Sequence, residues 1–168
     1  DSDWENTGNW LDNAVPSASD NVQISQITYP PSLDASKTIN NLLIDEGSSI
    51  EFANSSGALK VKGNIVNNGT LDVNAGKIIL MGNKIQYIKG SQIPTFYELK
   101  MNTDDSIRLL TDVHFRGPLV AQKGTFDFNG KDVVLLSDAE NTGSIGEIKS
   151  NAEIIGDTIT IHRYFPAA

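Results

Sequence analysis

Short apolar–polar–apolar triplets recur along the chain, and in four places a glycine and one or two small residues come immediately before the triplet. The four segments are residues 47–52, 57–61, 69–73 and 124–128. Glycine lets the chain turn, and two inward side chains flanking one outward side chain are typical of a short half-buried strand. Because no helical pattern separates the copies, the repeat predicts the coils of a parallel β-solenoid.

The same alternation predicts many further strands, separated by only a few residues each. From residue 39 onward they are expected at 42–44, 50–52, 59–61, 65–66, 71–73, 78–81, 85–88, 96–99, 107–110, 113–115, 119–121, 126–128, 133–136, 145–148, 153–155 and 159–161. No segment carries the apolar spacing of a capped amphipathic helix. With about three strands and roughly 20–25 residues in a coil, the chain has length for on the order of five or six coils.

An antiparallel β-sandwich is the alternative all-β fold, since it too joins short strands by frequent turns. Hairpins favour two-residue Asn-Gly or Asp-Gly turns. The chain has only Asn68-Gly69 and Asn129-Gly130. The scarcity of such turns favours the solenoid over the sandwich.

Residues 1–35 differ from the remainder of the chain. They contain both tryptophans, Trp4 and Trp10, together with one alternating strand at Val22–Ile24. A solenoid needs a cover over its first coil, because an open sheet edge invites aggregation. We therefore expect residues 1–35 to form an N-terminal cap and residues 36–168 to form the coils.

Charge and composition exclude several kinds of partner. The net charge is −8 and the lysines and arginines are scattered singly, which disfavours nucleic-acid binding. No apolar run approaches the ~20 residues of a membrane span, so we expect no membrane insertion. Cysteine is absent, which removes thiol catalysis, disulfides and cysteine-based metal sites.

The chain opens with Trp4-Glu5-Asn6-Thr7-Gly8-Asn9-Trp10, followed by Val15-Pro16 and Asp20-Asn21-Val22-Gln23-Ile24. This arrangement resembles the "W…NW…P…D-x-V-x-I" of the right-handed parallel β-helix modules in large secreted surface proteins of Bacteroidetes-type bacteria. Residues 41–47 and 61–70 resemble the family's "NL-x-I-x-x-G" and "V-x-G-N-I-x-N-N-G-T" coils, and residues 159–167 resemble its "V-x-x-R-Y-I-P-A" ending.

The resemblance implies a module excised from a longer polypeptide, extracellular or on the cell surface, with further domains after it. Its expected role is structural or adhesive: a rigid, non-catalytic segment that presents or spaces other domains. Its expected partners are those neighbouring domains or a surface polysaccharide.

Aromatic residues suggest a second function, that of a carbohydrate-binding module. If Trp10, Tyr87 and Tyr97 were exposed and coplanar on one face, they would form a platform for a sugar ring. Packing of Trp4 and Trp10 against the end of the solenoid is the structural alternative for the tryptophans.

Asp104 and Asp105 offer hard oxygen ligands, and calcium is the only cofactor that the sequence suggests. EF-hand spacing and calcium-binding nonapeptide repeats are both absent, so a solvated acidic turn is the simpler interpretation. His114 and His162 have no further zinc ligands near them in sequence.

An active site is the weakest of the hypotheses, and we do not expect this chain to be an enzyme. Glu51, Asp72 and Asp127 occupy the outward position of their triplets and would form an acidic column if they stacked. A polysaccharide lyase would need carboxylates beside a basic group, for instance Arg108 or Arg116 near Asp104 and Asp112.

Two further expectations concern polar side chains. Ser106 and Thr158 follow aspartate and precede an apolar residue, which resembles the O-glycan acceptor motif of exported Bacteroidetes proteins. Side-chain amides are expected to stack between coils at four asparagines, namely Asn64, Asn67, Asn68 and Asn74.

Overall fold

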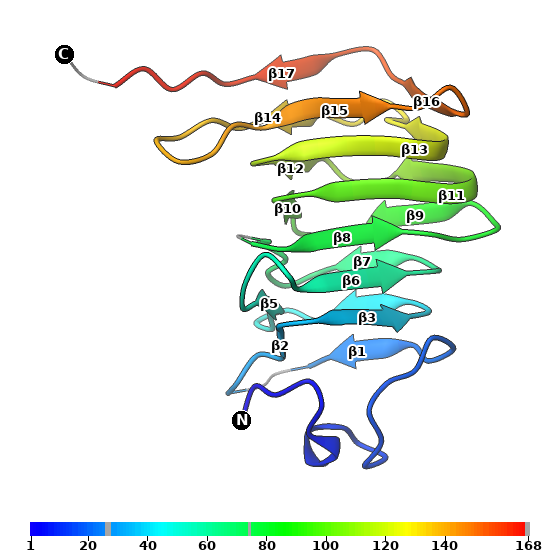
Figure 1. Cartoon of the computed structure of the whole chain (residues 1–168), viewed down its shortest axis with the longest axis vertical. Coiled ribbons are helices and arrows are strands. Elements are labelled where there is room, and N and C mark those ends of the chain that lie inside the picture. The colour runs from blue at the N-terminus through cyan, green and yellow to red at the C-terminus, as the bar shows by residue number, and fades with distance from the viewer. Residues whose placement is uncertain (26–27, 74, 167–168) are drawn as a thin grey trace.

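The computed structural model is a right-handed parallel β-solenoid of about five turns (Figure 1). It describes residues 1–25, 28–73 and 75–166. Apart from a short 3-10 helix, η1 (Thr7–Asn9), its elements are strands. These are β1 (Val22–Ile24), β2 (Ser32–Leu33), β3 (Ser36–Ile39), β4 (Leu42–Ile44), β5 (Glu51–Phe52), β6 (Ala58–Val61), β7 (Ile65–Asn67), β8 (Lys77–Leu80), β9 (Gln86–Lys89), β10 (Thr95–Phe96), β11 (Leu99–Leu109), β12 (Val113–Phe115), β13 (Pro118–Asp127), β14 (Val133–Leu135), β15 (Ser144–Ile148), β16 (Ala152–Ile155) and β17 (Ile159–Ile161).

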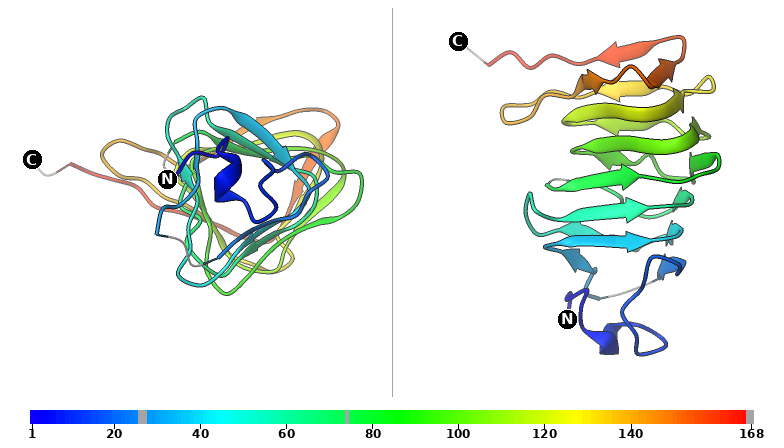
Figure 2. Two further views of the ribbon diagram at one scale, coloured as in Figure 1. Left: turned by 90° about the horizontal axis from the view of Figure 1, so that it is seen from below. Right: turned by 45° about the vertical axis from the view of Figure 1, so that its right-hand side comes forward.

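Each turn of the solenoid crosses three faces, which we call A, B and C. Face A contains β3, β6, β8, the first part of β11 and of β13, and β15. Face B contains β1, β4, β7, β9, the last part of β11 and of β13, and β16. Face C contains β2, β5, β10, β12, β14 and β17. Strands of successive turns pair in parallel on every face, and the chain traces a closed ring when seen along the axis (Figure 2).

Inward side chains stack from turn to turn into continuous apolar columns. On face B the register aligns Val22, Leu42, Ile65, Ile88 and Leu109, all of them buried. Equivalent columns on the other faces include Ile39–Val61–Leu80–Met101–Ala121 on face A and Phe96–Phe115–Leu135 on face C. Burial of these side chains is the main source of stability, and each turn gains it from its neighbours.

The sequence pattern predicted this architecture correctly. The strands pair in parallel, which excludes the sandwich; among the described residues the one antiparallel bridge joins Ser137 to Thr142. The turns contain between 19 residues, from Ile107 to Phe126, and 28 residues, from Phe126 to Ile154.

Some strand boundaries were predicted wrongly. Residues 96–99 were expected to form one strand, but β10 ends on face C at Phe96 and β11 begins on face A at Leu99. Conversely, β11 and β13 each pass from face A to face B as one strand, and their mutual pairing shifts register at this corner, near Asn102. A tight corner can thus be made without a break in the strand.

The segment before β1 covers the first turn. Trp4 is 1% exposed and belongs to the core. The backbone carbonyl of Ser2 accepts from Ser32 N at 2.8 Å, and Glu5 forms an ion pair with Lys37 of β3. Two strands that lie within the expected 1–35 cap, β1 and β2, pair as members of the first turn with β4 and β5.

Candidate functional site

A cleft lies at the N-terminal end of the solenoid, between the covering segment and the first turn. Its volume is about 1090 Å³. Its apolar lining includes Trp10, Leu11 and Tyr29, and its acidic lining includes Asp12 and Asp20. We call it the cap cleft. Its volume is that of a site for a small ligand or a short peptide.

Trp10 is held rigidly on one side of the cap cleft. Its indole N–H donates to the carbonyl oxygen of Trp4 at 2.9 Å, and the two rings meet edge to face with centroids 4.8 Å apart. Leu11, the next residue, is fully exposed, and Tyr29, which also lines the cleft, is 62% exposed. Exposed apolar side chains around one concavity are the usual composition of a binding site.

The charge of the cap cleft is negative. Asp20 accepts a hydrogen bond from Ser17 N at 2.8 Å, and this bond lowers the pKa of its carboxyl group, which stays ionised. Asp12 accepts from Ala14 N at 3.4 Å, which leaves most of its carboxylate free. No lysine or arginine lies among the described lining residues. The cleft therefore favours neutral or cationic ligands.

One wall of the cap cleft is the edge of β1 that has no strand partner among the described residues. On its other edge β1 bonds to β4: Val22 N donates to Asn41 O at 2.8 Å, and Asp45 N donates to Ile24 O at 2.9 Å. Backbone groups of successive strand residues point in alternate directions, so the N–H and C=O of Gln23 face away from β4. Val22, Gln23 and Ile24 all line the cleft.

The three aromatic residues expected to bind a sugar do not share a face. Trp10 lies in the cap cleft, Tyr87 points outward on face B, and Tyr97 follows β10 on face C. Trp10 and Tyr97 also pack against the core, so each has only part of its ring available. A single platform formed by the three rings is absent.

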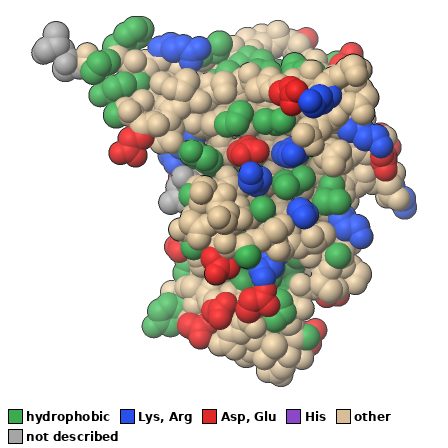
Figure 3. All heavy atoms as spheres, in the orientation of Figure 1, with side chains coloured by type: hydrophobic (Ala, Val, Ile, Leu, Met, Phe, Trp, Pro, Cys, Tyr) green, Lys and Arg blue, Asp and Glu red, His purple; other side chains and the backbone are tan. Residues whose placement is uncertain are grey.

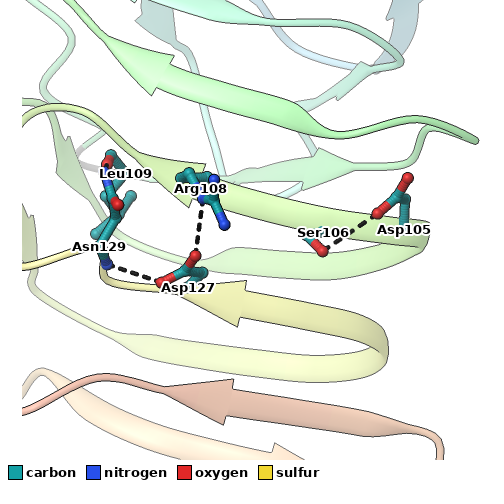
Figure 4. A network of polar contacts seen from close by, with 6 residues as sticks. All are labelled: Asp105, Ser106, Arg108, Leu109, Asp127 and Asn129. Carbon is teal, nitrogen blue, oxygen red and sulfur yellow. Dashed lines mark hydrogen bonds and ion pairs between the residues drawn. The ribbon is translucent and has the colours of Figure 1, made fainter.

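Asp104 and Asp105 lie exposed where β11 bends from face A to face B. Asp104 forms an ion pair with Lys123, and Asp105 accepts from the hydroxyl of the adjacent Ser106 at 3.2 Å (Figure 4). Across the described residues, no group of three or more histidine, aspartate or glutamate side chains could hold a metal ion. Thr158 is exposed just before β17, whereas Ser106 is partly buried.

The acidic column expected from the triplets does not form as a single row. Asp127 lies on face B, where it accepts from Arg108 Nε at 2.8 Å (Figure 4). Asp72 and Glu51 lie on face C, and Asp72 accepts from Arg116 at 2.8 Å. The two arginines are therefore each paired with a single aspartate on different faces, and neither pairs with Asp104 or Asp112 in a lyase-like cluster.

His114 lies on face C in the row between Thr95 and Val134. Partial burial lowers the pKa of His114, and the charges of His162 and Arg116 lower it further, while Asp112 opposes them. The imidazole is therefore neutral near pH 7. His162 is exposed and follows β17, two strands away on the same face.

Asparagine side chains link the turns at the corner before face B. Asn41 donates from its amide to Asn21 Oδ1 at 2.6 Å and accepts from Asn64 N at 2.6 Å; Asn64 in turn accepts from Tyr87 N at 2.8 Å.

Of the four asparagines expected to stack, Asn64 and Asn68 accept a backbone N–H from the next turn. Asn67 donates to Gln92 O at 3.2 Å, and Asn74 lies outside the described residues.

The sequence pattern missed the cap cleft, and with it Leu11 and Tyr29. A leucine between Trp10 and Asp12 in an otherwise polar segment is the one signal that was available. Within the described segments no helix is long and apolar enough to cross a membrane. Comparison of the chain with models of protein families, with curated proteins and with solved structures found no match.

Proposed function

We propose that this chain is a structural module: a rigid, non-catalytic β-solenoid segment of a large secreted or cell-surface bacterial protein, which presents or spaces other domains. The observation that carries the proposal is the unbroken stacking of the interior columns. On all three faces residues of successive turns pair in parallel register, apart from shifts where β11 pairs with β13 and where β13 pairs with β15, and the aligned inward side chains from β1 to β14 are buried. Close-packed interiors of this kind resist bending and compression.

The polar groups on the lateral faces also support a mechanical role. The Arg108–Asp127 and Arg116–Asp72 pairs join strands of different turns, and Asn41 joins its own turn to both neighbours. These contacts tie turns together along the axis. The secreted location rests on the resemblance of the motifs and on the acidic, cysteine-free composition.

Rigidity is the property to test first. Asp34 and Asn151 are exposed, lie in the first and last turns, and have no side-chain bonds among those found in the described residues. Because the chain lacks cysteine, Asp34→Cys and Asn151→Cys can be labelled specifically with a donor and an acceptor dye. We expect one narrow population of energy-transfer efficiency that stays constant from 10 to about 40 °C, below the usual melting range.

A second double variant, Asp34→Cys with Glu46→Cys, carries the same two dyes at neighbouring corners of the solenoid. It serves as the control for motion of the dyes themselves. A broad or divided population in the long pair, with a narrow one in the control pair, would contradict a rigid spacer.

Carbohydrate binding is the second candidate, and it is favoured by the exposed aromatic lining of the cap cleft. A glycan array probed with and without calcium tests it. Binding that is lost in a folded Trp10→Ala variant and kept in Tyr87→Ala and Tyr97→Ala variants would place the sugar in the cleft. No binding to any glycan would count against this candidate.

A further inference from the structure

The charge of face A is opposite to that of the whole molecule. Residues 58–62, 77–84 and 98–102 lie in three successive turns of face A and at its corner with face B, and we call them the lysine band. The band contains five lysines and one acidic residue, Glu98, in a chain of net charge −8. A positive surface on an otherwise negative molecule attracts anions to that surface alone.

The register of the solenoid brings together lysines that are scattered singly in the sequence. Lys60 of β6 aligns with Ile79 of β8, and Ile79 aligns with Lys100 of β11. Lys60 and Lys100 therefore lie in one outward row, about 10 Å apart at the usual spacing of paired strands. The row continues to Thr38 in β3 and to Val120 in β13. Figure 3 shows basic side chains gathered over the middle of this face, with apolar ones between them.

Most lysines of the band are not neutralised by a neighbour. Among the described residues, no ion pair or side-chain hydrogen bond is found for Lys60, Lys62, Lys84 and Lys100. Glu98 is paired with Lys77 at 3.6 Å. At the corner with face B, Asp104 is paired with Lys123, while Asp105 accepts only from Ser106. The four ammonium groups are thus available to an external anion.

The chemistry of the lysine band distinguishes between classes of anionic ligand. The band contains neither arginine nor an aromatic side chain, which disfavours nucleic acid, because bidentate phosphate contacts and base stacking need these residues. Within β6, β8 and the first part of β11 no large apolar side chain is exposed, whereas surface binding to membranes combines basic residues with exposed Trp, Phe or Leu.

Between the lysines the surface is aliphatic. Ile79 and Val120 are half-buried in the same row as Lys60 and Lys100. Point charges separated by half-buried aliphatic side chains suit a polymer whose charges are separated by neutral rings with apolar C–H groups. An acidic polysaccharide has this composition.

We propose that the lysine band binds an acidic polysaccharide, whose carboxylate or sulfate groups pair with Lys60, Lys62 and Lys100 while its sugar rings lie over Ile79. The polymer runs along the solenoid axis, because the aligned row crosses one turn after another. This site is separate from the cap cleft, whose negative lining repels such a ligand. The proposal goes beyond the spacer function and does not depend on it, since a chain that binds no polymer would still be a rigid segment.

Titration calorimetry with polygalacturonate and with dextran sulfate tests the proposal, with neutral dextran as the control ligand. We expect both polyanions to bind in about 0.01 M salt and to bind more weakly in about 0.15 M salt, where the Debye length falls from about 30 Å to about 8 Å. Dextran should not bind. A double variant, Lys60→Gln with Lys100→Gln, should weaken binding by about tenfold or more.

A second double variant, Lys89→Gln with Lys131→Gln, is the matched control. It removes the same charge away from face A, because Lys89 lies in β9 on face B and Lys131 precedes β14 on face C. We expect its affinity to stay within about twofold of the wild type. Thermal unfolding verifies that both double variants are folded.

A gain of binding tests the direction of the polymer. Thr38 aligns with Lys60, so Thr38→Lys extends the row of charges by one turn and should strengthen binding by about threefold. Thr70→Lys adds the same charge at an exposed position that pairs with Ser49, away from face A, and should have no effect.

Three outcomes would overturn the proposal. The first is that neither polyanion binds at the lower salt concentration. The second is an equal effect of matched variants, either the two double variants or Thr38→Lys and Thr70→Lys, which would mean that net charge alone governs the attraction. The third is that phosphatidylserine vesicles or single-stranded DNA bind through Lys60 and Lys100 while neither polysaccharide competes. Rigidity measured by energy transfer is unaffected by any of these outcomes, so the two proposals fail separately.

Discussion

The guanidinium of Arg116 donates to the carboxylate of Asp72 at 2.8 Å, although the two residues are 44 positions apart in sequence. On face C the register runs from Asp72 to Thr95 and from Thr95 to His114, so the ion pair reaches across the intervening strand. Two turns that share no strand pairing are thereby connected directly at the surface.

The Arg116–Asp72 ion pair should contribute little to the free energy of unfolding, although it connects two turns that are not adjacent. The side chains of Arg116 and Asp72 are 32% and 41% exposed, and exposed ion pairs contribute roughly 0.2–1 kcal/mol. We expect Arg116→Met and Asp72→Asn to lower the free energy of unfolding by less than about 1 kcal/mol each. A double-mutant cycle by urea denaturation measures the coupling. A coupling energy of several kcal/mol would mean that the pair acts as a structural clamp.

Gly90 should be far less tolerant of substitution than Gly130. Both have positive φ, 135° and 71°. A Cβ on Gly90 would lie 2.0 Å from the carbonyl oxygen of Asn67, whereas a Cβ on Gly130 would meet nothing within 4 Å. Gly130→Ala should cost only the ~1–2 kcal/mol of the left-handed conformation.

Gly90→Ala should cost clearly more than Gly130→Ala, because the backbone of the preceding turn must also move. Thermal unfolding of both variants checks the order, and equal losses would show that the turn at Gly90 relaxes freely.

The asparagine row should be sensitive at its central member. Asn41→Ala removes a bond on each side, to Asn21 and to Asn64. It leaves a partly buried backbone N–H without its acceptor, which costs about 1–3 kcal/mol. The neighbouring Asn40 makes one exposed side-chain bond, to Asn21 at 2.9 Å, so Asn40→Ala is the matched control. Chemical denaturation should show a larger loss in the free energy of unfolding for Asn41→Ala than for Asn40→Ala. The reverse order would show that the asparagine row does not stabilise the fold.

His114 should make the solenoid less stable in mild acid. Because the folded state lowers its pKa below 6.5, the unfolded chain binds a proton more readily, and stability falls as the pH decreases through 6.5 toward the folded pKa. Above that window the residue contributes no pH dependence.

The melting temperature of the wild type should therefore decline relative to that of His114→Gln between pH 7.5 and 5. Removal of the neighbouring charge by His162→Gln should reduce the decline. A constant difference between wild type and His114→Gln across this range would contradict the assignment.

The periodic part of the fold was predictable because inward and outward positions alternate with strand period. Ile50, Leu59, Leu71 and Phe126, each the first apolar residue of a glycine-led triplet, are all buried. The path of the chain around the corners was not predictable. The apolar alternation breaks off at Asn102, yet strand β11 (Leu99–Leu109) continues through the bend there.

Candidate sites were harder to predict than strands. The middle position in the triplet predicts that the side chains of Asp72 and Asp127 point outward. Which face of the solenoid each residue lies on depends on the number of residues in every preceding turn. The cap cleft arises from contacts between residues far apart in a segment without periodicity, so no local pattern encodes it.

The turn between Phe126 and Ile154 is longer than the others, yet its strands still pair in parallel with the turn before, in continuous register on face B and with one shift on face A. Its additional residues protrude between β14 and β15, where Ser137 bridges Thr142 and Asp138 accepts from Glu140 N and Asn141 N (Figure 1). Insertions at this corner consequently leave the pitch of the solenoid unchanged. A lineage could lengthen or diversify this loop, and an engineer could graft a foreign sequence into it, without altering the distance between the two ends of the rod.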